Sequence, residues 1–335
     1  MKPPAAIEGS RDWEITLSYN TPQETAALAV ESGVAKANLS PDRALVGGFL
    51  AGAYIAFGGL LAVVCSAGLK PDQWGGIITL VTGLVFSLGL ILTIVGGAEL
   101  LTGNMALLPM AALQKRITLA QMGVNWLILT VANLIGSLFV AYVFADKTGV
   151  IGTASSKAGT PAASNFARLT SITVSKAVTE THLQQFLRAV GCNWLVCLAV
   201  FLALAATDVA GKILAIVFPI TAFVALGFDH VVANMFFLPA AMWLHVPGVT
   251  FNNTLSNLIV AWLGNAVGAA LFVASAYWFV YLRNREPGAP PAPSGATGAT
   301  GASTATGAGA TAAADGHRRA TSTDVTAEQA EISGA

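Results

Sequence analysis

The sequence predicts an all-α integral membrane protein with six transmembrane helices, built as two inverted repeats of three helices each. The first observation is composition: 55% of the 335 residues are hydrophobic and 10% are charged, whereas soluble domains average about 25% charged. The second is a series of six long apolar segments, and the third is a polar motif that occurs in two of them. Since backbone in lipid must satisfy its hydrogen bonds internally, such segments are expected to be helices.

The charge balance argues against binding to nucleic acid. The chain carries 17 Lys and Arg against 17 Asp and Glu, so its net charge is zero and no basic surface is expected. Cys65, Cys192 and Cys197 lie in apolar stretches, where a thiol usually behaves as a small buried hydrophobe. No histidine pair has the spacing of metal ligands, so no metal site is expected.

Residues 1–43 form a polar N-terminal segment with one predicted short amphipathic helix. Thr21, Pro22 and Glu24 match a capping box with proline at the first helical position. We expect this helix to end near Ser40 and Pro41, before the first apolar segment begins.

The transport domain is predicted over residues 44–283. Residues 44–68 contain no charged side chain and exceed the ~20 residues that a membrane-spanning helix needs. The six expected spans are residues 44–68, 75–113, 119–145, 182–207, 211–244 and 252–282. With both termini in the cytoplasm, the six basic residues that flank the spans on that side outnumber the four clearly outside, namely Lys70, Lys147, Lys157 and Arg168. We therefore predict a multi-pass protein of the cell membrane with both termini cytoplasmic.

Spans two and five are predicted to be broken rather than continuous helices. Polar residues and glycines interrupt both in mid-segment; the polar ones are Glu99, Thr102 and Asn104 in span two and Asp229, His230 and Asn234 in span five. Irregular backbone at membrane depth is tolerated only where it lines a cavity or is buried in protein.

The two broken segments belong to an internal repeat. Residues 97–104 match residues 227–234 as Gly-x-acid-x-x-x-small-Asn. Farther along, Asn125, Asn133 and Gly136 have the same spacings as a second set, Asn257, Asn265 and Gly268. Each repeat, 44–145 and 164–283, holds an odd number of spans, so the two are inverted. Inverted repeats with broken helices point to a transport site near the midplane, where exposed helix ends suit a small anion.

Two further segments lie outside the spans. The connection over residues 146–180 starts with loop composition, and from Ser164 its pattern predicts a lead-in helix on the membrane surface. Residues 284–335 are rich in Gly, Ala, Thr, Pro and Ser and have few large apolar side chains. Such a composition cannot bury enough surface to offset ordering entropy, so a disordered low-complexity tail is expected.

These motifs resemble the formate/nitrite transporter family over roughly residues 20–283. The matching stretches are residues 47–54 (GGFLAGAY), 97–104 (GAELLTGN) and 227–236 (GFDHVVANMF). The resemblance implies an aquaporin-like fold and a homopentamer with one pore per protomer. It also implies transport of small monovalent anions such as formate, nitrite or hydrosulfide, without ATP or a redox cofactor, and no enzyme activity.

The resemblance also implies roles for individual residues. The pore centre would be formed by Thr102 and His230 facing each other, with Asn193 and Asn265 nearby. The constrictions would be formed by Phe86, Leu90 and Phe223, with Leu101 at the loop, and Lys176 would attract anions. The chain departs from many relatives at two positions, with Leu101 in place of Phe and Asp229 in place of Glu.

The remaining polar residues have simpler interpretations. We expect Glu99 and Asp229 to accept hydrogen bonds from backbone amides at their own breaks, with Asn104 and Asn234 as further structural residues there. Thr102 and Asn193 could instead only join helices together.

Formate is the leading substrate, and His230 could act either as a proton donor or as a fixed polar guide. Alternatives are a nitrite or hydrosulfide channel, a proton-coupled acetate or lactate transporter, and a membrane sensor or scaffold. An enzyme with a triad of Thr102, His230 and Asp229 is disfavoured, because adjacent residues on one helix point their side chains apart.

Overall fold

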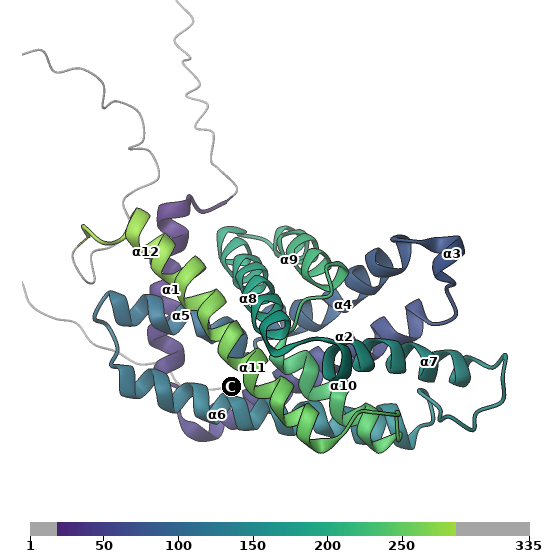
Figure 1. The fold of residues 1–335 in the computed structure, drawn as a ribbon. Coiled ribbons are helices and arrows are strands. Elements are labelled where there is room, and N and C mark those ends of the chain that lie inside the picture. Colours follow the sequence, from purple (N-terminus) through teal and green to yellow (C-terminus); the bar gives the residue numbers. More distant parts are fainter. Residues whose placement is uncertain (1–18, 286–335) are drawn as a thin grey trace, which may run out of the picture. The chain divides into compact units, whose positions relative to one another are not determined.

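The structure is a computed structural model that describes residues 19–285. Figure 1 shows these residues as a set of packed helices. Within this range there is no named strand, and the only β pairing is an isolated bridge between Tyr19 and Ala206. The prediction of an all-α fold is confirmed. The predicted disordered tail lies outside the described residues.

The helices fall into two series of similar order, except that the short α3 occurs only in the first. The first series is α1 (Pro22–Ala37), α2 (Pro41–Ser66), α3 (Pro71–Trp74), α4 (Ile77–Val95), α5 (Leu101–Leu113) and α6 (Leu119–Phe139), which continues as the π-helix η1 (Val140–Lys147). The second is α7 (Pro161–Val174), the π-helix η2 (Ser175–Thr179), α8 (His182–Ala205), α9 (Val209–Ala225), α10 (Val231–Trp243), α11 (Phe251–Ala269), the π-helix η3 (Ala270–Ser275) and α12 (Ala276–Tyr281).

Five helical stretches are long and apolar enough to cross a membrane. They are α2, α4, α6 with η1, α8, and α11 through α12, while α5, α9 and α10 are shorter apolar helices. Spans two and five are interrupted where the sequence predicted, between α4 and α5 and between α9 and α10. At each interruption a glycine adopts positive φ, +77° at Gly97 and +71° at Gly227, which glycine adopts without steric cost. The count of six crossings stays a prediction.

Local sequence sets the starts of the helices. The predicted capping box is present: the Thr21 hydroxyl accepts from the backbone N–H of Glu24, and the Glu24 carboxylate accepts from the N–H of Thr21. Thr118, Thr181 and Thr250 cap α6, α8 and α11 in the same way. These caps satisfy amides that the first helical turn leaves without partners.

Glycines allow close contact between helices in both series. A Cβ atom on Gly136 of α6 would overlap the carbonyl of Phe49 in α2, and one on Gly268 of α11 would overlap the carbonyl of Val190 in α8. Gly52 likewise faces the backbone of α6. Small residues at these positions therefore let backbones approach, as is common between membrane helices.

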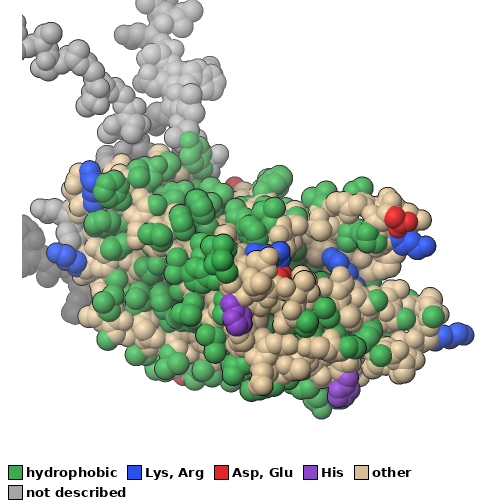
Figure 2. All heavy atoms as spheres, viewed as in Figure 1, with side chains coloured by type: hydrophobic (Ala, Val, Ile, Leu, Met, Phe, Trp, Pro, Cys, Tyr) green, Lys and Arg blue, Asp and Glu red, His purple; other side chains and the backbone are tan. Residues whose placement is uncertain are grey.

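The half-helices α5 and α10 form the centre of the fold. Their first eleven residues, Leu101 to Ala111 and Val231 to Ala241, are buried. The outer helices instead expose large apolar side chains: Phe218 is 73%, Leu119 72% and Leu127 67% exposed. Figure 2 shows hydrophobic side chains over much of the face in view. A surface of this kind is expected to contact lipid or other protein.

Candidate functional site

The two half-helices meet at Thr102 and His230. Thr102 lies in the first turn of α5, and His230 is the N-cap residue of α10. The Thr102 Oγ1 and His230 Nε2 atoms are 2.9 Å apart, and both residues are buried. The structure thus brings together the two residues that the family resemblance placed at one centre.

The hydrogen bonds of His230 define its tautomer. Its Nδ1 accepts from the backbone N–H of Ala233 at 3.1 Å, as an N-cap side chain does. A nitrogen that accepts carries no proton, so this network assigns the imidazole proton to Nε2. The Nε2–H then donates to the Thr102 hydroxyl, which leaves the hydroxyl hydrogen of Thr102 available to another acceptor.

An asparagine of α6 supports the first break. Its side chain, Asn133, accepts from the N–H of Leu101 at 2.9 Å and donates to the carbonyls of Glu99 at 3.0 Å and Gly48 at 2.8 Å. The groups of Leu101 and Glu99 lie at the break, where backbone leaves the helical pattern and needs other partners, and the carbonyl of Gly48 belongs to the crossing helix α2. The sequence analysis identified Asn133 as a position of the internal repeat but did not predict its role at the break.

Asn265 of α11 supports the second break in the same manner. It accepts from the N–H of Val231 at 2.8 Å and donates to the carbonyls of Asp229 at 2.9 Å and Ala189 at 2.8 Å. Its side-chain amide is therefore occupied by backbone groups. Asn193 donates to the carbonyls of Thr102 at 3.2 Å and Asn265 at 2.9 Å, and so connects α8 to both α5 and α11.

A lysine, a carboxylate and two asparagines form a closed network beside the first break. Lys36 of α1 pairs with Glu99 at 2.7 Å. Asn104 donates to Glu99 at 3.3 Å and to Asn125 at 3.0 Å, and Asn125 donates back to the carbonyl of Lys36 at 3.1 Å. Each member of the network thus bonds to two others.

The same network exists beside the second break. Lys176 of η2 pairs with Asp229 at 2.9 Å, and Asn234 donates to both Asp229 and Asn257 at 2.8 Å. Asn257 then donates to the carbonyl of Lys176 at 3.1 Å. Because every bond has its counterpart in the first network, the internal repeat is present at the level of individual side chains.

The prediction of hydrogen-bond partners for the two acidic residues at the breaks was wrong. Glu99 and Asp229 were expected to accept from backbone amides at their breaks, but in the described part of the chain their carboxylates accept from a lysine and an asparagine. The physical reason is burial, since Asp229 is 0% exposed and a buried carboxylate is tolerated when it is paired with a cation. The backbone amides at the two breaks donate instead to the side chains of neutral asparagines, Asn133 on α6 and Asn265 on α11.

Lys36 is a residue that sequence reasoning missed, because residues 1–43 were treated as a lead-in outside the repeats. The signal was a shared helix start: Thr21 and Pro22 begin α1, just as Thr160 and Pro161 begin α7. Lys176 lies one residue farther from its proline than Lys36 does. The π-helical stretch η2 takes up that extra residue, so a search at fixed spacing fails.

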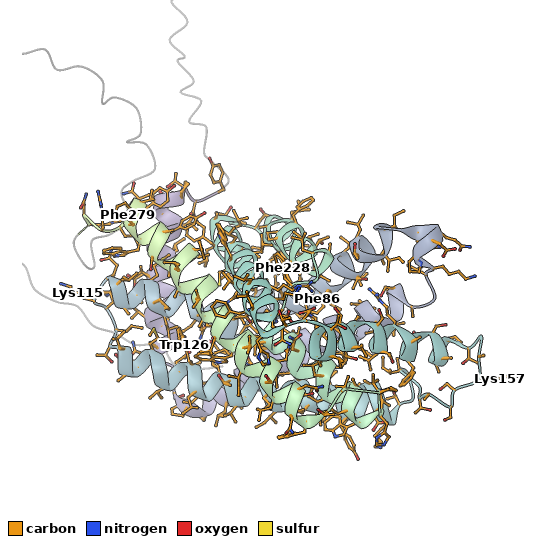
Figure 3. The ribbon with its side chains drawn as sticks, viewed as in Figure 1. Phe86, Lys115, Trp126, Lys157, Phe228 and Phe279 are labelled. Carbon is orange, nitrogen blue, oxygen red and sulfur yellow. The ribbon has the colours of Figure 1, made fainter. Side chains whose placement is uncertain are left out.

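Aromatic side chains lie against the central histidine. The rings of Phe86 and Phe223 are 5.8 Å apart in an edge-to-face contact, and the Phe223 ring is 5.9 Å from that of His230. Leu90, one turn along α4 from Phe86, is 1% exposed, and Leu101 is 0% exposed. Figure 3 labels Phe86 in the middle of the molecule, with Lys115 and Lys157 toward opposite ends of the view.

Two cavities approach the centre, and each contains one lysine of the two networks. The first, the histidine cavity, is lined by residues that include Phe86, Arg168, Lys176, Glu180, Arg188, Phe223 and His230. The second, the Lys36 cavity, is lined by residues that include Lys36, Thr93, Gly97, Glu99, Leu107 and Lys212. Among the described residues no side chain lines both. Leu90, Leu101 and Thr102 are buried and line neither cavity, and together with His230 we call them the junction.

The geometry does not support an enzyme triad. His230 Nδ1 is bonded to Ala233, and Asp229 is bonded to Lys176 and Asn234 rather than to the imidazole. The reason given from sequence also changes, because Asp229 and His230 precede the first residue of α10 instead of lying within one helix.

The chain is similar in sequence to proteins named as formate transporters and channels. The formate/nitrite transporter family model matches residues 23–279. A probable formate transporter of Methanothermobacter thermautotrophicus is 45% identical over 272 residues, which are 79% of this chain and 98% of that protein. A formate channel, BtFdhC, of Bacillus thuringiensis is 36% identical over 79% of this chain and 97% of its own.

A solved structure, a pentameric formate channel with formate bound, superposes with a TM-score of 0.63 at 27% identity, over 72% of this chain and 98% of that one. The matched proteins are named as transporters and channels rather than enzymes. Together with the apolar helices, these matches show that the chain is a multi-pass membrane protein and belongs to the formate/nitrite transporter family.

Proposed function

We propose that this protein conducts small monovalent anions across the cell membrane, with formate as the leading substrate. The observation that carries the proposal is the Nε2–H of His230, which lines the histidine cavity and lies 2.9 Å from the buried Thr102 hydroxyl. Formate is also the substrate after which the relatives from Methanothermobacter thermautotrophicus and Bacillus thuringiensis are named. The pentamer of the matched structure supports a homopentamer here.

The central site must offset the cost of a charge in the membrane. Even a charged side chain at the centre of a membrane helix costs about 2.5–3.5 kcal/mol on insertion scales. In our proposal an anion leaves Lys176 in the histidine cavity and meets the Nε2–H of His230 and the hydroxyl of Thr102. It leaves through the Lys36 cavity. The N-termini of α5 and α10, which begin at this junction, add a favourable field for negative charge.

His230 acts in this proposal as a fixed hydrogen-bond donor. To give a proton to formate and remain neutral, the imidazole would first have to carry protons on both nitrogens. That requires Nδ1 to lose its bond from Ala233 N–H. Proton transfer from His230, the alternative drawn from the sequence, therefore includes a local opening at the start of α10.

Leu90, Leu101, Phe86 and Phe223 form the hydrophobic constriction in this proposal. Their side chains are buried around the junction, so an anion passes only when they move aside. Asn193 and Asn265 hold the half-helices in register from α8 and α11.

The test is uptake into proteoliposomes that contain the purified protein. Formate, nitrite, hydrosulfide, acetate and chloride are compared over pH 5–8 for the wild type and for His230→Asn and His230→Phe. His182 is exposed and bonds to Ser256, so His182→Asn serves as the matched control. We expect formate uptake that falls at least tenfold in both His230 variants and stays unchanged in the control.

The outcome also separates the alternatives. Uptake of nitrite or hydrosulfide in preference to formate would make this a channel for those anions. Acetate uptake that follows an imposed proton gradient would make it a proton-coupled carrier. If the wild type transports none of the five, the proposal fails and a sensor or scaffold takes its place.

A further inference from the structure

The histidine cavity contains three cationic side chains that differ in their partners. Lys176 pairs with Asp229 at 2.9 Å, and Arg188 pairs with Glu180 at 2.6 Å. Arg168 lines the same cavity, yet no carboxylate of the described residues lies within ion-pair distance of it. Two of the three cations therefore have a carboxylate partner within the protein, and the third has none among the described residues.

Neutral hydroxyl groups fix the orientation of the Arg168 side chain. Its Nε donates to Ser66 Oγ at 2.8 Å, and its Nη2 donates to Thr82 Oγ1 at 3.1 Å. Both hydroxyls use their own hydrogens on helix carbonyls, at Ala62 and Ile78 respectively, each at 2.6 Å. The hydroxyls are therefore held as acceptors, and the guanidinium is clamped between α2 and α4.

Part of the guanidinium remains without a protein partner. Nη1 makes no hydrogen bond to the described protein, although a guanidinium has five N–H donors. Arg168 is only partly buried and is one of the residues that line the cavity. Burial lowers the pKa of Arg168 below its ordinary value, because solvent is removed and no carboxylate replaces it. An anion from solution would compensate this charge.

We propose that Arg168 forms a separate binding site for a planar anion with two oxygens, such as a small carboxylate, on the approach to His230. This inference rests on the proposed function, because it supplies a loading step for the same substrate. A guanidinium fork matches a carboxylate with two parallel N–H···O bonds, whereas a halide is a single acceptor atom and cannot form such a parallel pair. The site therefore favours formate over chloride before the central constriction is reached.

Position and space both fit a two-site path. Thr82, which binds Arg168, lies one turn before Phe86 on α4, about 6 Å along the helix axis. Phe86 in turn packs on Phe223, which contacts His230. The cavity encloses about 230 Å³, while a water molecule takes roughly 30 Å³ of liquid. A formate ion with some of its water therefore fits.

The experiment measures binding and transport separately. Saturation-transfer NMR of the formate proton with detergent-solubilised protein reports binding, and proteoliposome uptake at increasing formate concentration reports half-saturation and maximal rate. The variants are Arg168→Gln, which removes the charge, and Arg168→Lys, which keeps the charge but not the fork. Lys157→Gln is the control, because this exposed residue loses the same charge in the connection that leads to α7.

For Arg168→Gln we expect a several-fold weaker binding signal and a several-fold higher half-saturation concentration, with a similar maximal rate. Arg168→Lys should retain attraction but lose the preference for formate over chloride. A binding signal for Arg168→Gln equal to that of Lys157→Gln would overturn the inference, even if formate is transported. Absence of transport in the wild type would instead overturn the proposed function, while the binding signal still tests Arg168.

Discussion

At the scale of single residues, the charges around the histidine cavity determine how the protein responds to pH. Glu180 lies in the connection before α8, where Oε1 bonds to Arg188 and Ser175 and Oε2 has no described partner. Burial, with Asp229 nearby, raises the pKa of Glu180 to about 7. The pKa in the folded state thus lies above the ordinary value of 4.5, so ionisation of this group costs stability.

The sign of this effect gives a prediction for Glu180→Gln. The contribution of Glu180 to stability is fully present below pH 4.5 and is lost as pH rises through about 7. The wild type should therefore lose more thermal stability between pH 6 and 8 than Glu180→Gln does. Formate uptake should also fall over this range in the wild type, because a new negative charge appears beside Lys176, Arg168, Arg188, Asp229 and His230. Equal pH slopes in the two proteins would contradict this assignment.

Two lysine–aspartate pairs of the same length allow a test of burial. The Lys176–Asp229 and Lys147–Asp146 pairs are both 2.9 Å long, but the side chains are 11% and 0% exposed in the first pair and 57% and 20% in the second. Breaking a buried pair costs about 3–5 kcal/mol because the remaining charge is uncompensated. Breaking an exposed pair costs much less, because water and salt screen the remaining charge.

Lys176→Met should therefore lower the melting temperature strongly, and Lys147→Met should lower it little. The double variant Lys176→Met with Asp229→Asn should recover most of the loss, since the buried charge is then absent. Melting of the purified proteins in detergent measures all four. If the double variant is no more stable than Lys176→Met, the loss comes from packing rather than from charge.

At the scale of elements, the paired helices α2 with α6 and α8 with α11 depend on glycine. Gly268 of α11 lies against the backbone of α8, whereas Gly123 of α6 has no neighbour that an added Cβ would meet. Both positions are helical, so alanine gains a similar amount of helix propensity at each, up to about 1 kcal/mol.

Gly268→Ala should destabilise the protein, because the two helices must separate to admit the methyl group; overpacking typically costs about 1–3 kcal/mol. Gly123→Ala should be neutral or slightly stabilising. Because both substitutions change helix propensity by a similar amount, a difference between their melting temperatures reports the close helix contact at Gly268. Equal behaviour of the two variants would mean that close contact at Gly268 is not needed.

At the scale of the whole molecule, the apolar outer surface must be covered either by lipid or by neighbouring copies of the chain. Large apolar side chains are exposed on several helices, among them Phe218 on α9, Leu127 on α6 and Phe251 at the start of α11. Lipid covers such side chains in a monomer, and neighbouring copies cover part of them in a closed ring.

We expect the purified protein to be a pentamer in mild detergent, as in the matched channel structure. Native mass spectrometry should give five times the chain mass of 34.3 kDa. A monomeric or dimeric species that still transports formate would show that each protomer works without a ring. Deleting residues 287–335 should leave the pentamer unchanged, because the family match ends at residue 279.

The sequence by itself determined the features that depend on local order along the chain. Hydropathy marked the long helices, the capping box marked the start of α1, and the repeated motif located both breaks, while the family resemblance placed Thr102 and His230 at one centre. These are readable because a membrane helix must be long and apolar, so a polar residue within it stands out.

Only the tertiary structure decided which side chains complete these features. Glu99 meets Lys36 across the fold, the amides of the breaks meet Asn133 and Asn265, and Arg168 stays without a carboxylate. None of this follows from a local pattern, because each contact joins helices far apart in the chain. A buried charge takes whichever partner the packing brings near, and that partner is set by the arrangement of all the helices.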